Sequence, residues 1–325
     1  MSTTIKAQFP DEQETDGSFK RQADAFTDWV RADGSSPYPA QAGRYHLYVS
    51  LACPWASRTV IVRKLKGLEE AIGMTVVDPI RDERGWRFMH DQRDPLNGWA
   101  FLSEAYFASD PGYRGRVTVP VLWDKERGRI VSNDDDHIMR MLESEFDEFA
   151  TNPQLDLYPR ALRHEIDKLN DFIYQTFNNG VYRAGFATSQ ASYEEAAYGV
   201  FSAIDAMEER LAYHRYLFGP QPVETDWRFF VTLIRFDPVY YGHFKCNLHR
   251  IVDYPNLYGY LRDLYQIDGI AETVDFDQIK RHYYYTHDDI NPTRIVPIGP
   301  IMDLTSHHNR DHLIDAWQPV PSTAL

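Results

Sequence analysis

The segment Cys53-Pro54-Trp55-Ala56 has the residue types and spacing with the most chemical potential in the chain. A short β-rich run, residues 46–50, ends just before it, and a helical pattern begins at Pro54, since proline is common at the first position of a helix. A thiol at such a junction lies at the positive end of the helix dipole, near unpaired N–H groups, and both favour the thiolate. We therefore predict that Cys53 is a nucleophile. The alternative is a structural cysteine that packs as a small hydrophobic residue.

The surroundings of Cys53 limit how a disulfide formed there could be resolved. Ala56 occupies the place of the second cysteine of a C-x-x-C motif, so no local disulfide cycle is available. The resolving thiol must then be Cys246, another chain or a small molecule. Because the sequence around Cys246 is helical in pattern, we expect that cysteine to contribute packing.

A second feature is the pair Val119-Pro120 inside the strand-like run 117–123. Proline cannot donate to a strand ladder, so it marks an edge strand, a bulge or a cis bond. The order of patterns over residues 45–146 is β-α-β, a long polar stretch at residues 78–116, then β-β-α. In a thioredoxin-like domain of this order, a cis-proline faces the start of the catalytic helix. The backbone of the residue before it, here Val119, is left to pair with a peptide-like thiol.

These elements suggest an extended arm and two domains. Residues 1–44 are polar and rich in Gly, Pro and Asp, residues 45–150 form the α/β domain, and residues 151–325 are mainly helical, with an irregular Pro-rich tail after Asp289. Helical patterns in the second half cover residues 161–177, 192–211, 226–240 and 257–265.

Composition excludes several classes of protein. The 325 residues include 34 Lys and Arg against 48 Asp and Glu, a net charge of −14, which argues against a general nucleic-acid binder. Two cysteines exclude a disulfide-rich secreted fold, a Cys-rich zinc site and an iron–sulfur cluster. No apolar run approaches the ~20 residues of a membrane span, and the N-terminus is unlike a signal peptide. We expect a soluble, cytoplasmic protein that binds neither membranes nor nucleic acid.

The run around Cys53, residues 48–56 (YVSLACPWA), resembles the catalytic segment of the glutathionyl-hydroquinone reductases, the xi class of the glutathione S-transferases, which are similar to the omega class. The similarity extends over roughly residues 15 to 300. Further matching segments are residues 15–19, 116–124, 130–133, 178–187, 243–247 and 279–284. The resemblance implies a glutathione S-transferase fold: an α/β thioredoxin-like N-terminal domain, an all-α C-terminal domain and a homodimer.

The resemblance also implies a thiol-dependent reductase that removes glutathione, or a similar low-molecular-weight thiol, from S-conjugated hydroquinones. Cys53 would attack the conjugate's sulfur, and a second thiol would resolve the mixed disulfide. Thiol and conjugate are the small-molecule partners, and neither a metal nor a flavin is required. By resemblance, Tyr182 and Tyr283 would hydrogen-bond the substrate oxygen, with Tyr284 as a substitute for Tyr283. The expected thiol-binding residues are Trp86, Arg116, the Val119 backbone, Asp134 and Asp135.

The thiol site departs from the family at Asp134 and Asp135, where Glu-Ser is usual. Asp134 keeps the charge on a shorter arm, whereas Asp135 puts an anion where the family binds the γ-glutamyl carboxylate. Two carboxylates ~4 Å apart repel by roughly 4 kcal/mol at an effective dielectric of 20. Either Asp135 merely caps the helix and glutathione still binds, or the thiol is a different one, such as the sugar thiol mycothiol.

Three other functions compete with this one. A metal enzyme would use the residues 134–137 or the histidines at 307, 308 and 312, but consecutive helical side chains point in different directions. A transferase fold can also serve as a non-catalytic binding protein. Ordinary transfer of glutathione to electrophiles uses a Ser or Tyr hydroxyl, so the cysteine argues against it.

Overall fold

The computed structural model describes residues 10–89 and 93–314, and within them the chain forms two compact units. The first, which we call the thioredoxin-like unit, comprises the described residues of 22–156 together with 272–286. The second, the helical unit, comprises residues 10–21, 157–271 and 287–314. The mixed α/β and all-helical parts expected from the sequence are both present. The domain boundaries at residues 44 and 150 stay predictions.

A four-stranded mixed sheet of order β4-β3-β5-β6 is the centre of the thioredoxin-like unit. Its strands are β3 (Tyr45–Val49), β4 (Gly73–Val76), β5 (Val121–Asp124) and β6 (Arg129–Ser132). Strand β3 is buried throughout and pairs in parallel with β4 and antiparallel with β5. Strand β5 begins only after Pro120, later than the run 117–123 suggested, and the Val119–Pro120 bond is cis, one of the three possibilities that proline raised.

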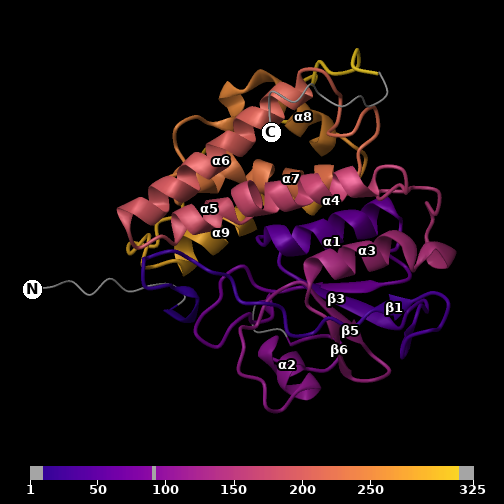
Figure 1. Cartoon of the computed structure of the whole chain (residues 1–325). Coiled ribbons are helices and arrows are strands. Elements are labelled where there is room, and N and C mark those ends of the chain that lie inside the picture. The colour runs from indigo at the N-terminus through magenta and orange to yellow at the C-terminus, as the bar shows by residue number, and fades with distance from the viewer. Residues whose placement is uncertain (1–9, 90–92, 315–325) are drawn as a thin grey trace, which may run out of the picture. The chain divides into compact units, whose positions relative to one another are not determined.

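Helices cover both faces of this sheet (Figure 1). Helices α1 (Pro54–Leu65) and α3 (Asp135–Ser144) pack together on one face, and α2 (Ser103–Ser109) contacts β6 on the other. Helix α2 lies in the long polar stretch 78–116, where the sequence patterns indicated neither a helix nor a strand. A 3-10 turn, η3 (Asp147–Phe149), follows α3.

Helix α9 (Phe276–Thr286) belongs to the thioredoxin-like unit although residues 157–271 come before it in the helical unit. The Asp275 carboxylate accepts the Gln278 N–H at 2.9 Å, the usual arrangement at a helix start. Its buried side chains are Ile279, His282 and Tyr283, so one face of the helix lies inward. The sequence patterns did not predict this helix.

Residues 22–44, the second half of the expected arm, are bonded to the edge of the sheet. The Asp28 N–H donates to the carbonyl of Val131 in β6 at 3.1 Å, and the Phe26 N–H donates to Asn133 Oδ1 at 2.8 Å. Two short strands, β1 (Val30–Arg31) and β2 (Tyr38–Pro39), pair in parallel within this segment. Residues 22–44 are therefore part of the thioredoxin-like unit and extend the edge of its sheet.

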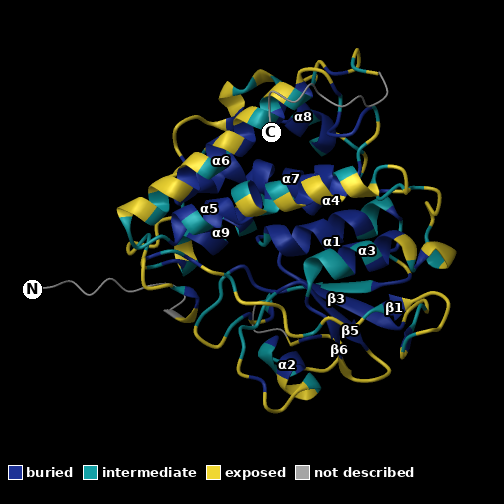
Figure 2. Ribbon diagram, in the orientation of Figure 1, coloured by how far each residue is buried: buried dark blue, intermediate teal, exposed yellow. Residues whose placement is uncertain are grey.

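The helical unit is built from five helices, two of which continue into π-helical turns. They are α4 (Arg163–Ile173) with η4 (Tyr174–Asn178), α5 (Gly180–Gly185), α6 (Gln190–Leu211), α7 (Glu224–Arg235) with η5 (Phe236–Tyr240), and α8 (Pro255–Tyr265). Every residue of α7 is buried, so it forms the core of the unit, whereas α6 exposes one face (Figure 2). Short 3-10 turns occur at η1 (Pro10–Glu12), η6 (Ile251–Asp253) and η7 (Ala271–Thr273).

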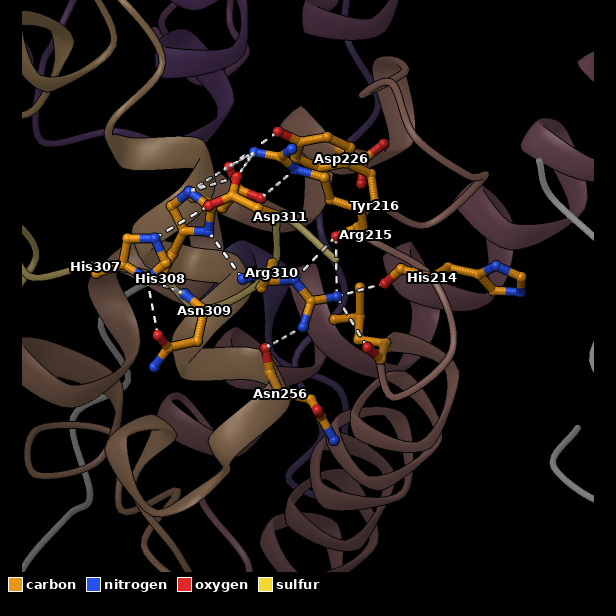
Figure 3. Close-up of polar contacts among 12 residues, drawn as sticks. His214, Arg215, Tyr216, Asp226, Asn256, His307, His308, Asn309, Arg310 and Asp311 are labelled. Atoms are coloured by element: carbon orange, nitrogen blue, oxygen red, sulfur yellow. Dashed lines mark hydrogen bonds and ion pairs between the residues drawn. The ribbon is translucent and has the colours of Figure 1, made fainter. Parts of the chain in front are cut away.

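The tail after α9 contains no helix or strand up to residue 314, as predicted from Asp289 onward. Residues 303–311, which we call the C-terminal strap, are nevertheless tightly bound to the helical unit (Figure 3). The buried Arg310 guanidinium donates to four carbonyls, those of Leu211 at the end of α6, His214 and Arg215 just after it, and Asn256 at the start of α8. The strap passes so close to α8 that a Cβ on Gly259 would lie 2.8 Å from the His308 carbonyl oxygen.

Candidate active site

Cys53 is the N-cap of α1, at the junction between β3 and that helix. Its backbone is extended, with φ −79° and ψ 121°, and Pro54 is the first helical residue, as the sequence predicted. The Cys53 carbonyl accepts bonds from the Ser57 N–H at 3.0 Å and from the Ser57 hydroxyl at 2.9 Å. The thiol is partly exposed at the positive end of the helix dipole, a position that stabilises a thiolate.

The backbone of Val119 lies next to this thiol. Cys53 Sγ is 3.6 Å from the Val119 carbonyl oxygen and donates to it. The preceding peptide is fixed by the buried Tyr106 of α2, whose hydroxyl accepts the Thr118 N–H at 3.1 Å and donates to the Thr118 carbonyl at 2.9 Å. Helix α2, which the sequence patterns missed, therefore positions the residue predicted to pair with a thiol.

The start of α3 is capped by Asp134. Its Oδ1 accepts the N–H groups of Asp136 at 3.0 Å and His137 at 3.1 Å, which satisfies two of the first donors of the helix. The idea that Asp135 caps this helix was therefore wrong, because Asp134 performs that role.

Asp135 instead forms an ion pair with Arg58 of α1. The Arg58 side chain is only 1% exposed, and its Nη1 lies 2.7 Å from Asp135 Oδ2 and 3.1 Å from Asp136 Oδ1. The same guanidinium lies 4.7 Å from the ring centroid of Trp55. The pair partly neutralises Asp135, so the repulsion expected between this carboxylate and an incoming one is reduced.

Two other predicted thiol-binding residues lie in the segment between β4 and β5. Trp86 is buried, with 5% of its surface exposed, and its carbonyl accepts the Leu102 N–H at 2.8 Å. Arg116 is half-buried, and its carbonyl accepts the Tyr113 hydroxyl at 2.6 Å. The backbones of both residues are thus fixed by hydrogen bonds.

The two tyrosines expected to bind the substrate oxygen lie in different units. Tyr283 of α9 is 1% exposed and belongs, like Cys53, to the thioredoxin-like unit. Tyr182 of α5 lies in the helical unit, where the Arg21 guanidinium is 4.9 Å from its ring centroid. Tyr284 is half-buried, and burial raises the pKa of its hydroxyl. The roles of Tyr182 and Tyr283 stay predictions.

Cys246 lies in the interior of the helical unit. Its side chain is fully buried, and burial raises the pKa of its thiol to about 12. At neutral pH this thiol is protonated and behaves as a packed hydrophobic group. Neither cysteine of the chain forms a disulfide.

Two properties of the described residues bear on the competing functions. Among residues 10–89 and 93–314, no group of three or more His, Cys, Asp or Glu side chains is arranged to hold a metal ion. In the same part of the chain, none of the helices has both the length and the apolar character needed to cross a membrane.

The chain matches two family models. The model of the glutathione S-transferase N-terminal domain covers residues 52–145, and that of the C-terminal domain covers residues 190–263. The glutathionyl-hydroquinone reductase YqjG of Escherichia coli is 53% identical over 312 residues, which are 93% of this chain and 94% of that protein. This chain belongs to the glutathionyl-hydroquinone reductases. The relationship confirms the glutathione S-transferase fold and the family recognised from the sequence.

One further relative and two solved structures are similar to this chain over most of its length. The glutathionyl-hydroquinone reductase PcpF of Sphingobium chlorophenolicum is 45% identical over 297 residues, 90% of this chain and 93% of that protein. A xi-class glutathione S-transferase of Natrialba magadii is 48% identical with a TM-score of 0.87, covering 92% of this chain and 96% of that one. The glutathione-bound structure of Escherichia coli YqjG superimposes with a TM-score of 0.85 over 88% of this chain and 96% of that chain, at 53% identity.

The site residues expected from the resemblance stay predictions, but the structure places most of them in one unit. Cys53, Trp86, Arg116, Val119, Asp134, Asp135 and Tyr283 all belong to the thioredoxin-like unit. Arg58 is not among the residues predicted for the site, yet it is the buried partner of Asp135. Its position five residues after Cys53 was the one signal in the sequence that could have indicated a role.

Proposed function

We propose that this protein is a glutathione-dependent reductase that removes glutathione from S-conjugated hydroquinones. The observation that supports this most directly is Cys53 at the N-terminus of α1, with its sulfur 3.6 Å from the Val119 carbonyl. The chain that carries this arrangement is 53% and 45% identical to two proteins named glutathionyl-hydroquinone reductase.

In the first half of the proposed reaction, the Cys53 thiolate attacks the glutathionyl sulfur of the conjugate. A sulfur–sulfur bond forms, the bond between sulfur and the aromatic carbon breaks, and its electron pair goes to that carbon, which takes up a proton. The free hydroquinone leaves, and Cys53 holds glutathione as a mixed disulfide. The Tyr283 and Tyr182 hydroxyls are proposed to donate hydrogen bonds to the phenolic oxygen, where charge develops.

In the second half, a glutathione thiolate attacks the glutathionyl sulfur on Cys53. Oxidised glutathione leaves with one sulfur of each molecule, and the Cys53 thiolate is restored. Altogether one conjugate is reduced and two glutathionyl groups leave as the disulfide. The buried Cys246 has its thiol pKa raised to about 12, so it is a poor nucleophile for this step.

For the bound thiol we propose Trp86, Arg116, the Val119 backbone and the start of α3 as the binding groups. The Arg116 guanidinium can donate two parallel hydrogen bonds to a carboxylate. The N–H groups at the N-terminus of α3 can bind the γ-glutamyl group. Because Arg58 partly neutralises Asp135, the charge conflict that favoured a sugar thiol is weaker. The glutathione-bound structure of the Escherichia coli relative, 53% identical to this chain, also supports glutathione.

The test is a steady-state assay with a glutathionyl-hydroquinone and either glutathione or mycothiol as reductant, monitored by chromatography of the released hydroquinone. We expect turnover with glutathione at low concentration, loss of turnover in Cys53→Ala, and little change in Cys246→Ser. Mass spectrometry should detect glutathione on Cys53 when the second thiol is omitted.

Efficient turnover with mycothiol alone would support mycothiol as the thiol that the enzyme uses. Glutathione binding without turnover would support a non-catalytic binding protein, and conjugation of electrophiles without a mixed disulfide would support ordinary transfer.

We further propose that the protein is a cytoplasmic homodimer, as the family resemblance implies. Multi-angle light scattering after size exclusion should give twice the mass of the 37.9 kDa chain. Fractionation of the source cells should place the protein in the fraction that contains cytoplasmic marker enzymes.

A further inference from the structure

His282 of α9 contacts the start of the segment between β4 and β5, the segment that carries Trp86. The side chain is buried, and its Nδ1 lies 2.7 Å from the Pro79 carbonyl oxygen. A carbonyl oxygen only accepts hydrogen bonds, so Nδ1 carries the proton and donates. This bond fixes the orientation of the imidazole ring relative to the chain just after β4.

The imidazole ring also stacks on the indole of Trp86. The ring centroids are 5.0 Å apart and the planes are inclined by 20°. Hydrogen bonds fix the backbone at Trp86 and at the next residue, from the Leu102 N–H to the Trp86 carbonyl at 2.8 Å and from the Asp78 N–H to the Arg87 carbonyl at 2.9 Å. These bonds hold the main chain, whereas the stack with His282 contacts the indole ring itself.

His282 is followed on the same helix by Tyr283, the tyrosine proposed to bind the substrate oxygen. The two rings meet edge-to-face, with centroids 5.2 Å apart and an angle of 78°. His282 therefore lies between Trp86, on the proposed thiol side, and Tyr283, on the proposed substrate side. All of these residues belong to the thioredoxin-like unit.

We propose that His282 is a positioning residue for the bound thiol, acting through its stack with Trp86. This inference rests on the proposed function, which assigns Trp86 to the thiol. The effect comes from orientation. An indole that is already held in its binding orientation loses less conformational entropy when the thiol binds. His282 is not proposed to touch glutathione, the conjugate or the reacting sulfur atoms.

The test is a double-mutant cycle on thiol binding. The variants are Trp86→Leu, His282→Ala and the two together, each titrated calorimetrically with S-methylglutathione, which cannot form a disulfide. We expect each single substitution to weaken binding about tenfold and the double substitution to weaken it by little more than that, because two residues that act as one unit are not additive. An effect of about a hundredfold in the double variant, or unchanged binding in His282→Ala, would overturn the proposal.

Two controls separate positioning from a general structural role. His282→Phe keeps a stacking ring but loses the bond to Pro79, so it should bind S-methylglutathione within about threefold of wild type while melting at a lower temperature. Binding as weak as that of His282→Ala would contradict the role of the stack. His282→Phe also serves as the test if His282→Ala does not fold.

Tyr285→Phe, on the exposed side of α9, should bind like wild type. Because calorimetry needs no turnover, absence of reductase activity in the wild type would count against the proposed function, and the cycle would still test His282.

Discussion

Arg58 and Asp135 form an ion pair between the starts of α1 and α3, with Nη1 2.7 Å from Oδ2 and the arginine side chain almost fully buried. A buried guanidinium needs its partners, because an uncompensated buried charge is costly. The residue that departs from the family pattern, Asp135, is thus an anion with an internal counter-charge. This has consequences for both stability and thiol affinity.

Asp135→Ser restores the family residue at this position. We expect the KM for glutathione to fall a few-fold, because a hydroxyl replaces an anion near the proposed site of the γ-glutamyl carboxylate. The free energy of unfolding should fall by about 1 kcal/mol, since Arg58 loses its shorter carboxylate contact, the one with Asp135. Steady-state kinetics and urea unfolding measure the two effects. Asp136→Ser is the matched control and should leave the KM unchanged. An unaltered KM in Asp135→Ser would place that carboxylate away from the thiol.

Tyr283→Phe removes the hydroxyl proposed to bind the substrate oxygen while keeping the buried ring. The loss of one donor to a developing oxyanion lowers kcat by about 10²–10³-fold in other enzymes, and a similar loss is expected for release of the hydroquinone. Single-turnover chromatography of hydroquinone release measures it. Tyr285→Phe, two residues along the same helix and exposed, should react like wild type. Equal rates in both variants would remove Tyr283 from the proposed chemistry.

Arg310→Met should destabilise the helical unit. The substitution leaves four carbonyl groups, those of Leu211, His214, Arg215 and Asn256, without this buried donor. We expect a loss of roughly 2–4 kcal/mol, since unsatisfied buried groups cost about 1–3 kcal/mol and relaxation offsets part of the sum. Thermal unfolding followed by circular dichroism measures it. Arg294→Met, in the exposed part of the same tail, is the control and should change the melting temperature little.

Gly259→Ala tests how closely the C-terminal strap packs on α8. The added Cβ would meet the His308 carbonyl oxygen at 2.8 Å, a backbone atom that cannot rotate away. Overpacking of this kind costs about 1–3 kcal/mol, although alanine is otherwise the better helix former. Gly199→Ala in α6, where the Cβ would meet nothing within 4 Å, should be neutral or stabilising. A melting temperature for Gly259→Ala at or above that of wild type would contradict the close approach.

The stability of the protein should depend on pH through His46 of β3. Burial lowers the pKa of His46 to about 4, and its Nε2 lies 2.8 Å from Thr75 Oγ1. The folded state therefore keeps this ring neutral, while the unfolded chain takes up a proton below pH ~6.5. Its contribution to stability is complete above pH ~6.5 and is lost between that pH and about 4, at up to about 1.4 kcal/mol per pH unit.

Urea unfolding at several pH values between 7 and 4 tests this in wild type and His46→Gln. The slope should be shallower in the variant. Asp226 acts in the opposite direction, because burial raises the pKa of its carboxyl to about 6, so it adds stability as the pH falls through 6. Asp226 is present in both wild type and His46→Gln, so the difference between their two slopes reports on His46 alone. Identical slopes would show that His46 is not held neutral by the fold.

The sequence predicted features that depend on neighbouring residues. The junction at Cys53, the helix from Pro54 and the special geometry at Pro120 follow from residue types adjacent in the chain, and the structure has each of them. The Arg58–Asp135 pair joins residues 77 positions apart, so no local pattern could indicate it. A prediction that does not include this pair overestimates the repulsion between Asp135 and the carboxylate of an incoming thiol.

Helix α9 was missed for a different reason. Its residues FDQIKRHYYYT include few strong helix formers, and the three consecutive tyrosines weaken any periodic pattern. The signal was nevertheless present, because Ile279, His282 and Tyr283 are spaced three and four residues from the first, as on the buried face of a helix. His282 remained unassigned because its contacts with Trp86 and Pro79 depend on tertiary structure.

The chain leaves the helical unit after residue 271, supplies α9 to the thioredoxin-like unit and returns at residue 287. No single cut of the polypeptide therefore separates the two units. A chimera made by joining the first half of this protein to the second half of a relative would pair a foreign α9 with the native Trp86 and Cys53. Recombination between members of the family can preserve these contacts only if residues 272–286 are exchanged together with residues 22–156.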